Sequence, residues 1–182
     1  MSESNIGTIV LVHGAFEHAG RYDWLANQWY KEGYNVLYDD LPGQGNSEGI
    51  KGHIDSFDEY IQAIEKWIKE AEKLYKPIFL LGHSMGGLAV IRYMEEKKPD
   101  VIKGVILSSP GLGISGGPPK WLTKITESIE KVFPKLQVRT RIRRCVSTRN
   151  KTLHNRHQDP LFLKKVSIRW YYEFEGAITK VF

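Results

Sequence analysis

Four short apolar segments, separated by helical patterns, constrain the fold of this chain more than any other feature. They are almost wholly apolar rather than alternating, which is typical of strands that are buried on both faces of a sheet. Helical patterns between them predict a β-α-β-α-β-α-β order. We therefore expect an α/β fold with a parallel sheet, helices on both faces, and a ligand site at the carboxyl ends of the strands. The segments are Thr8–Val12, Tyr34–Tyr38, Ile78–Leu81 and Gly104–Leu107.

The helical patterns have recognisable ends. The first stops at Gly33, and the second starts with a capping box at Ser56–Glu59. The third is expected from Met85 to about Lys98. After Pro110 we expect no further strand, but a Gly/Pro-rich link, an amphipathic stretch from Trp121 to Phe133, an Arg-rich segment up to Gln158, and a last helix with Asp159 as N-cap and Pro160 as its first residue.

The strongest chemical motif is Gly82-His83-Ser84-Met85-Gly86, which lies between an apolar strand and a helix. A nucleophile elbow needs a strained strand-to-helix turn, and small residues two positions before and after the serine let neighbouring backbone pass close by. The first amide of the following helix, that of Met85, and the helix dipole would stabilise a developing oxyanion. The other interpretation is a tight turn in which Ser84 only caps the helix.

A second oxyanion donor is expected in the loop after the first strand, His13–His18. Gly14 would let the backbone turn so that the Ala15 amide faces the serine. His13 is interpreted as a structural residue, because it precedes the nucleophile in the chain. Glu17 and His18 are either rim residues of the site or merely exposed.

Together these segments resemble a known family. The resemblance is to the monoacylglycerol lipase and lysophospholipase branch of the α/β-hydrolase superfamily, in particular to its bacterial phospholipases, and it covers nearly the whole chain. The segments that carry it are His13–Tyr22, Asp40–Gly45, Gly52–Ile54 and Leu80–Gly87.

The resemblance implies a serine hydrolase of carboxylic esters that needs no cofactor and acts through an acyl-enzyme. Ser84 would be the nucleophile, and Ala15 and Met85 would supply the oxyanion amides. It also implies a hydrolase core over residues 1–110, a cap over residues 111–159, and a helix returning to the core over residues 160–182. The expected site lining is His13, Gly14, Phe16 and His83.

One expected part is missing. In this fold an acid and a histidine follow the nucleophile, each on a loop after a later strand, and two more β-α units would need roughly 60 residues. We therefore expect a chain that is truncated at its C-terminus, lacks the triad acid and histidine, and is inactive or nearly so by itself. Glu127 or Glu130 with His154 or His157 reproduces the chain order, but these residues fall in the cap segment.

The amino-acid composition limits the disulfides, metal sites, location and charged partners that we expect. Cys145 is the only cysteine, so no disulfide framework or zinc cluster is expected, and the reducing cytoplasm is the expected location. Residues 1–134 hold 14 basic and 18 acidic side chains, whereas residues 135–182 hold 12 and 3. This basic tail is either a solvated surface or a contact with anionic lipid.

Three functions compete at this point. The first is a serine hydrolase of lipid esters, such as a lysophospholipid or a monoacylglycerol. The second is a catalytically silent lipid or protein binder that keeps the pocket. The third is a nucleic-acid binder, which the poor interleaving of aromatic residues in the Arg-rich segment disfavours. The strand Gly104–Leu107 has no later strand to pair with, so we also expect self-association or association with a chain that supplies one.

Overall fold

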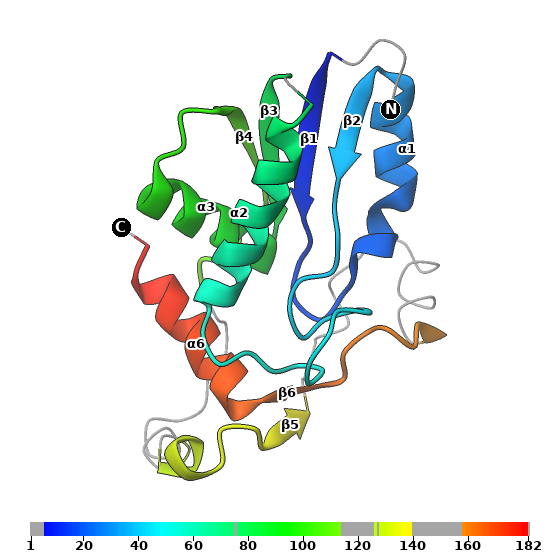
Figure 1. The fold of residues 1–182 in the computed structure, drawn as a ribbon. Coiled ribbons are helices and arrows are strands. Elements are labelled where there is room, and N and C mark those ends of the chain that lie inside the picture. Colours follow the sequence, from blue (N-terminus) through cyan, green and yellow to red (C-terminus); the bar gives the residue numbers. More distant parts are fainter. Residues whose placement is uncertain (1–5, 75, 114–125, 127, 140–157, 182) are drawn as a thin grey trace.

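A four-stranded parallel sheet forms the centre of the computed structural model, which describes residues 6–74, 76–113, 126, 128–139 and 158–181. The strand order is β2-β1-β3-β4, and all three neighbouring pairs are parallel (Figure 1). The predicted α/β architecture is confirmed. The strands are β1 (Gly7–Val12), β2 (Tyr34–Leu37), β3 (Ile78–His83) and β4 (Ile102–Ser108).

Helices cover both faces of this sheet, because alternate strand residues point to opposite sides. Val10, Val12 and Leu80 belong to one cluster with residues of α2, α3 and α6, whereas Leu11 and Leu81 pack with residues of α1. Figure 1 shows α2 and α3 on one side of the sheet and α1 on the other. The helices are η1 (Ala19–Tyr22), α1 (Asp23–Lys31), α2 (Asp58–Glu72), α3 (Met85–Lys97) and α6 (Ile168–Thr179).

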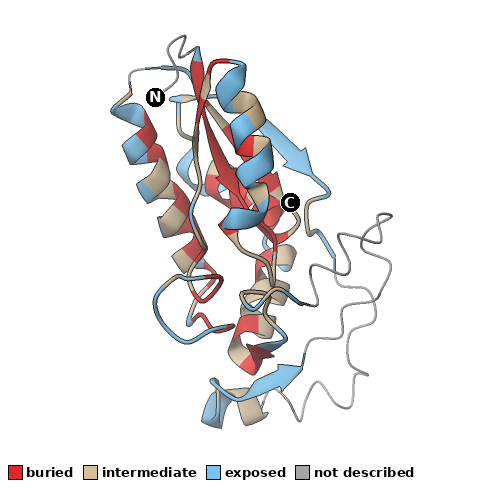
Figure 2. Ribbon diagram, turned by 90° about the vertical axis from the view of Figure 1, so that its right-hand side faces the viewer, coloured by how far each residue is buried: buried red, intermediate tan, exposed pale blue. Residues whose placement is uncertain are grey.

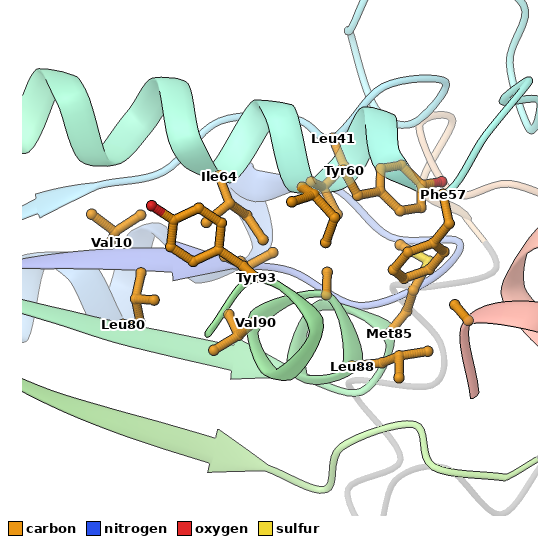
Figure 3. Packing of buried hydrophobic residues seen from close by; sticks show 14 of the residues in the cluster. Val10, Leu41, Phe57, Tyr60, Ile64, Leu80, Met85, Leu88, Val90 and Tyr93 are labelled. Carbon is orange, nitrogen blue, oxygen red and sulfur yellow. The ribbon is translucent and has the colours of Figure 1, made fainter. Parts of the chain in front are cut away.

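The larger cluster lies between the sheet, α2 and α3. Tyr60 and Ile64 of α2 and Met85 and Leu88 of α3 are fully buried within it. Figure 3 shows these side chains between the two helices and the strands, with Leu80 of β3 farther to the left in the same layer. The N-terminal turn of α3 is thus anchored in the core directly after Ser84.

The outer strand β4 has a different environment. Its residues are half-buried or exposed, and Val105, Ile106 and Leu107 expose 39%, 49% and 41% of their surface. Figure 2 shows this exposed edge beside the buried strands. No described strand pairs with the outer side of β4, as the sequence led us to expect.

Two short strands contradict the expectation that none follows Pro110. β5 (Gln137–Arg139) and β6 (Lys165–Ser167) form a separate antiparallel pair. Each has only three residues, too few for a pattern of alternation to be read from the sequence. The expected cap, residues 111–159, lies largely outside the described residues.

The predicted start of the last helix is wrong. α6 begins at Ile168, and Ser167 is its N-cap, with its hydroxyl accepting the Trp170 amide at 3.0 Å. Asp159 instead accepts the Leu161 amide at 2.9 Å and forms only a turn. Asp-Pro signals describe a local turn as well as a helix start, and here the chain continues as a strand before the helix begins.

The other helix ends follow the predictions more closely. Gly33 has a φ of 94° directly after α1, as expected of a glycine at this position. At the start of α2, the Ser56 amide donates to Glu59 Oε1 at 3.1 Å, which is one half of the capping box. The Ser56 hydroxyl accepts from Asp58 rather than Glu59, so the other half is not formed as predicted.

Candidate active site

Ser84 occupies the strained turn that the motif predicts. It lies between β3 and α3 with φ 52° and ψ −119°, a region that residues with a side chain rarely adopt. A Cβ atom at Gly86 would overlap the Val12 carbonyl oxygen, and one at Gly82 would lie 2.6 Å from the Gly86 oxygen. The two glycines are therefore required by close backbone packing on both sides of Ser84.

Backbone hydrogen bonds hold this turn in place. The Ser84 amide donates to the Ser108 carbonyl at the end of β4 (3.0 Å). The Ser84 carbonyl accepts the Gly111 amide (2.8 Å) and the Leu88 amide (3.1 Å). The elbow is thus tied both to its own helix and to the segment that leaves the neighbouring strand.

The loop after β1 lies directly against the elbow, since a Cβ atom at Gly14 would lie 3.2 Å from Ser84 Cβ. Within this loop, the Gly14 amide donates to Glu17 Oε1 (2.8 Å) and the Phe16 amide to Gln44 Oε1 (2.7 Å). The Ala15 amide between them, and the Met85 amide, have no hydrogen-bond partner in the described part of the chain. Two unpartnered donors therefore belong to residues adjacent to Gly14 and to Ser84.

Glu17 helps to build this loop and is not merely exposed. Besides the Gly14 amide, its Oε1 accepts the Tyr22 hydroxyl at 2.6 Å, and its Oε2 pairs with Arg21 Nε at 3.2 Å. Burial of Tyr22, together with the Glu17 carboxylate, raises the pKa of the Tyr22 hydroxyl, which therefore remains a proton donor at neutral pH. The sequence alone left both interpretations of Glu17 open.

His18 ties the same loop to the segment before β6. Its Nε2 lies 2.9 Å from Asp159 Oδ2. Burial alone would raise the pKa of the Asp159 carboxyl, but hydrogen bonds from His18 and the Leu161 amide outweigh burial and lower it. The side chain that was expected to cap a helix therefore anchors this segment to the loop after β1.

His13 is a structural residue. It is fully buried, its Nε2 accepts the Leu41 amide (2.9 Å), and its Nδ1 lies 2.8 Å from the Gly14 carbonyl oxygen. These partners fit the neutral ring with its proton on Nδ1. Burial lowers the pKa of His13, which keeps the ring neutral.

The other described histidines are also engaged away from Ser84. His53 contacts Ser167 Oγ (2.7 Å) and Asp55, and His83 contacts Ser108 Oγ (3.2 Å). Over the described ranges, no histidine is hydrogen-bonded to Ser84. Of the alternative pairs in the cap, Glu127, His154 and His157 lie outside the described residues, and Glu130 forms an ion pair with Arg169.

An aromatic stack stands next to the elbow. Phe16 packs against Trp170 with ring centroids 5.2 Å apart, and Trp170 stacks on Phe174 at 5.4 Å. A Cβ atom at Gly111 would lie 3.3 Å from both Phe174 Cζ and the Ser84 carbonyl carbon. The helical spacing of α6 identified Phe174 as apolar, but gave no signal that Trp170 and Phe174 approach Ser84.

A groove of about 300 Å³ opens near the ends of β3 and β4, on the side of the sheet that α1 covers. His83 belongs to its lining, whereas Ser84 does not. The lining residues are Glu17, Arg21, Tyr22, Leu25, Leu81, His83 and Ser108.

Two negative findings hold for the described part of the chain. No group of three or more histidine, cysteine or acidic side chains there is arranged to hold a metal ion. None of the helices there is long and apolar enough to cross a membrane.

Comparisons with known proteins agree with this geometry. The family model described as serine aminopeptidase, S33, matches residues 3–182. Phospholipase YtpA of Bacillus subtilis is 42% identical over 174 residues, which are 95% of this chain and 67% of that protein. The mouse monoglyceride lipase is 38% identical over 104 residues, which are 56% of this chain and 34% of the lipase.

Solved structures show the same fold. The monoacylglycerol lipase of Paleococcus ferrophilus matches with a TM-score of 0.80 and 34% identity, over 97% of this chain and 69% of its own. A monoglyceride lipase variant from Saccharomyces cerevisiae matches with a TM-score of 0.82 and 24% identity, over 98% of this chain and 61% of its own. With a family model covering almost the whole chain, this protein belongs to the serine aminopeptidase S33 family of α/β-hydrolases.

Proposed function

We propose that Ser84 is the nucleophile of a lipid ester hydrolase, and that the Ala15 and Met85 amides stabilise the oxyanion. The observation that carries the proposal is the strained backbone of Ser84, next to Met85 and in contact with Gly14, together with the Met85 and Ala15 amides, which have no hydrogen-bond partner in the described residues. Buried backbone amides normally have partners, so free donors beside a strained serine are suited to an incoming anion.

The chemistry follows from these groups. The Ser84 hydroxyl attacks the carbonyl carbon of the ester and gives its proton to a base, and the carbonyl oxygen becomes an oxyanion that the two amides bind. Collapse of this intermediate expels the alcohol and leaves an acyl-enzyme, which water then hydrolyses.

The base and the acid are the remaining requirement. Since the four described histidines contact other groups, the proposal places the base and its acid partner outside the described residues. The same observation favours the second candidate, a binder that holds a lipid in this pocket without cleaving it.

The aromatic stack and the names of the relatives favour a lipid ester as the substrate. Phe16 and Phe174, which pack on the buried Trp170, offer an apolar surface next to the elbow, which suits an acyl chain better than a small polar ester. The names of the relatives point to a phospholipid or a monoacylglycerol as the carrier of that chain.

The residues directly before the basic tail suit contact with a lipid surface. Val132 and Phe133 expose 67% and 62% of their surface, next to Lys131 and Lys135. Exposed apolar side chains among cations are suited to the surface of an anionic membrane. Binding to vesicles that contain phosphatidylglycerol, compared with vesicles of phosphatidylcholine alone, tests this contact.

The experiment on activity measures hydrolysis of a lysophospholipid and of a monoacylglycerol by the 182-residue chain and by the chain extended through two further β-α units of the fold. We expect the extended chain to hydrolyse the ester, and Ser84→Ala to reduce its rate to that of the 182-residue chain, about 10³ to 10⁴ faster than the uncatalysed reaction, which is what an oxyanion site and binding provide without a base. Equal, Ser84-dependent rates would place a base within the chain. Binding of the lipid without hydrolysis by either protein would favour the silent binder.

A further inference from the structure

Phe16 is the most constrained residue of the loop that carries the proposed oxyanion donor. Its φ is 69°, in the left-handed region that bulky residues avoid. Three contacts oppose this cost: the amide donates to Gln44 Oε1 (2.7 Å), the carbonyl accepts the Leu163 amide (2.9 Å), and the ring packs on Trp170. The backbone after Ala15 is therefore set by side chains from distant parts of the sequence.

Gln44 is the polar member of this set, and it is itself tightly held. Its side chain is buried, with 1% of its surface exposed, and lies in the loop between β2 and α2. While Oε1 accepts the Phe16 amide, Nε2 donates to Tyr60 Oη (3.3 Å) and lies 3.7 Å from Met85 Sδ. One buried amide thus touches Phe16, which follows the proposed donor Ala15, and Met85, whose amide is the other proposed donor.

Tyr60 extends the contact to α6. Its hydroxyl is fully buried and also accepts the Trp170 Nε1 proton at 2.8 Å. Burial raises the pKa of this hydroxyl, so it remains neutral. The resulting network runs from Trp170 on α6, through Tyr60 on α2 and Gln44, to the Phe16 amide.

We propose that Gln44, held by Tyr60 and Trp170, is the positioning residue of the oxyanion loop. By binding the Phe16 amide on one side, while Glu17 binds the Gly14 amide on the other, it leaves the Ala15 amide as the free donor of the loop. The inference rests on the proposed function, since it takes the Ala15 amide as the group that receives the oxyanion.

A role in fold stability alone would not place the polar atoms of Gln44 in this way. An apolar side chain of the same size would pack in a cavity lined by Tyr60 and Met85 without the cost of burying an amide. The side-chain amide of Gln44 instead binds one of the two backbone N–H groups adjacent to that of Ala15, and Glu17 binds the other.

The test uses Gln44→Met, which preserves side-chain volume and removes the acceptor, and Tyr60→Phe, which removes only the hydroxyl. Tyr93→Phe is the matched control, because Tyr93 is buried in the same cluster and its hydroxyl has no hydrogen-bond partner among the described residues (Figure 3). Amide exchange is measured by NMR at Phe16 and, as a reference for global stability, at Leu11 of β1. Decanoate, a carboxylate with an acyl chain, is titrated while the Ala15 and Met85 amide resonances are followed.

We expect Gln44→Met to speed exchange of the Phe16 amide relative to Leu11 on the order of tenfold, as for the loss of one hydrogen bond. Tyr60→Phe should give a smaller increase, and Tyr93→Phe none. Decanoate should shift both amides in the natural chain, whereas in Gln44→Met the Ala15 response should fall by more than half and the Met85 response should persist.

Two outcomes overturn the inference: unchanged exchange of Phe16 in Gln44→Met, or an Ala15 response that is the same with and without Gln44. If Gln44→Met lowers protection equally at Leu11, the decision passes to Tyr60→Phe, and equal exchange at Phe16 in that variant overturns the inference. A natural chain in which decanoate shifts neither amide overturns the proposed oxyanion site instead, while the exchange at Phe16 still judges the role of Gln44.

Discussion

The strands β1 and β4, which lie on either side of β3 in the sheet, differ sharply in environment. All six residues of β1 are buried, whereas β4, which holds the Ser84 amide through Ser108, has no buried residue among its seven, all of them described. Both strands pair with β3 in parallel, but β1 also pairs with β2, whereas no described strand pairs with the other edge of β4. What differs between β1 and β4 is how many of their faces and edges are covered by other parts of the described chain.

This contrast shows what fixes the candidate site. The oxyanion loop leaves the buried strand β1, and Ser84 leaves β3, so both parts of the site are set by close packing, which tolerates little displacement. The exposed edge contributes the Ser108 carbonyl, which accepts the Ser84 amide, and the Ser108 hydroxyl, which contacts His83. We therefore expect changes in the buried centre to disturb stability far more than equivalent changes on β4.

The largest difference in stability should appear between substitutions at two residues that are paired across β3 and β4. Leu80 of β3 is fully buried, and its partner Val105 of β4 exposes 39% of its surface. We expect Leu80→Ala to lower the free energy of unfolding by about 4 kcal/mol, because it removes buried methyl groups and leaves a cavity. Val105→Ala should cost about 0.5 kcal/mol. Denaturant unfolding followed by circular dichroism measures both, and equal losses would refute the contrast between the two strands.

Two helical glycines give the next largest difference. A Cβ atom at Gly86 of α3 would overlap backbone oxygens of β1 and the residue after it, whereas one at Gly176 of α6 meets no atom within 4 Å among the described residues. Gly86→Ala should therefore cost about 3 kcal/mol through overpacking. Gly176→Ala should add about 0.7 kcal/mol, because alanine favours the helix. Thermal unfolding checks both, and a stable Gly86→Ala variant would show that the elbow can relax.

The same contrast explains how much of the fold the sequence could predict. The central strands were predicted because burial on both faces leaves an apolar run, and the strained turn at Ser84 because it depends on neighbouring small residues. The strand ends were less accurate: β3 continues to His83 and β4 begins at Ile102. Backbone pairing extends beyond the apolar residues that reveal a strand.

Features that depend on distant contacts were missed. β5 and β6 pair across 26 or more residues, and neither has an apolar pattern of its own. Gln44 contacts Phe16 across 28 residues, and Trp170 contacts Tyr60 across 110. Nothing local to these residues distinguishes them from a loop glutamine or a core tryptophan. The roles of Ser84, Ala15 and Met85, and of the lining residues His13, Gly14, Phe16 and His83, remain predictions.

Acid should act on the buried centre through His13. Burial lowers the pKa of this ring in the folded state below its ordinary value of 6.5, which applies when the chain is unfolded. Below pH 6.5 the unfolded chain therefore binds more protons, so this contribution to stability is complete above pH 6.5 and is lost as the pH falls towards the folded pKa. We expect a loss of up to about 1.4 kcal/mol per pH unit in that window.

His13→Gln is the matched variant, since it retains an acceptor for the Leu41 amide and does not titrate. Its free energy of unfolding should be lower than that of the natural chain at pH 7 but flatter between pH 6.5 and 5.5. Parallel curves for the two proteins would mean that His13 does not titrate on unfolding.

The smallest effect concerns the exposed edge. Val105, Ile106 and Leu107 expose apolar surface on both faces of β4, and no described strand pairs with its outer backbone groups, a combination that favours pairing with another chain. Burying the exposed half of Ile106 in such a contact would contribute about 1 kcal/mol. Ile106→Lys should therefore weaken self-association at least about fivefold.

Trp24→Lys is the control, because Trp24 is 72% exposed but lies on a helix, which has no unpaired strand backbone. Size-exclusion chromatography with light scattering over a range of concentrations measures both variants. Equal weakening by the two would show that apolar surface alone drives association, and a natural chain that stays monomeric throughout would show that β4 needs no partner strand to remain soluble.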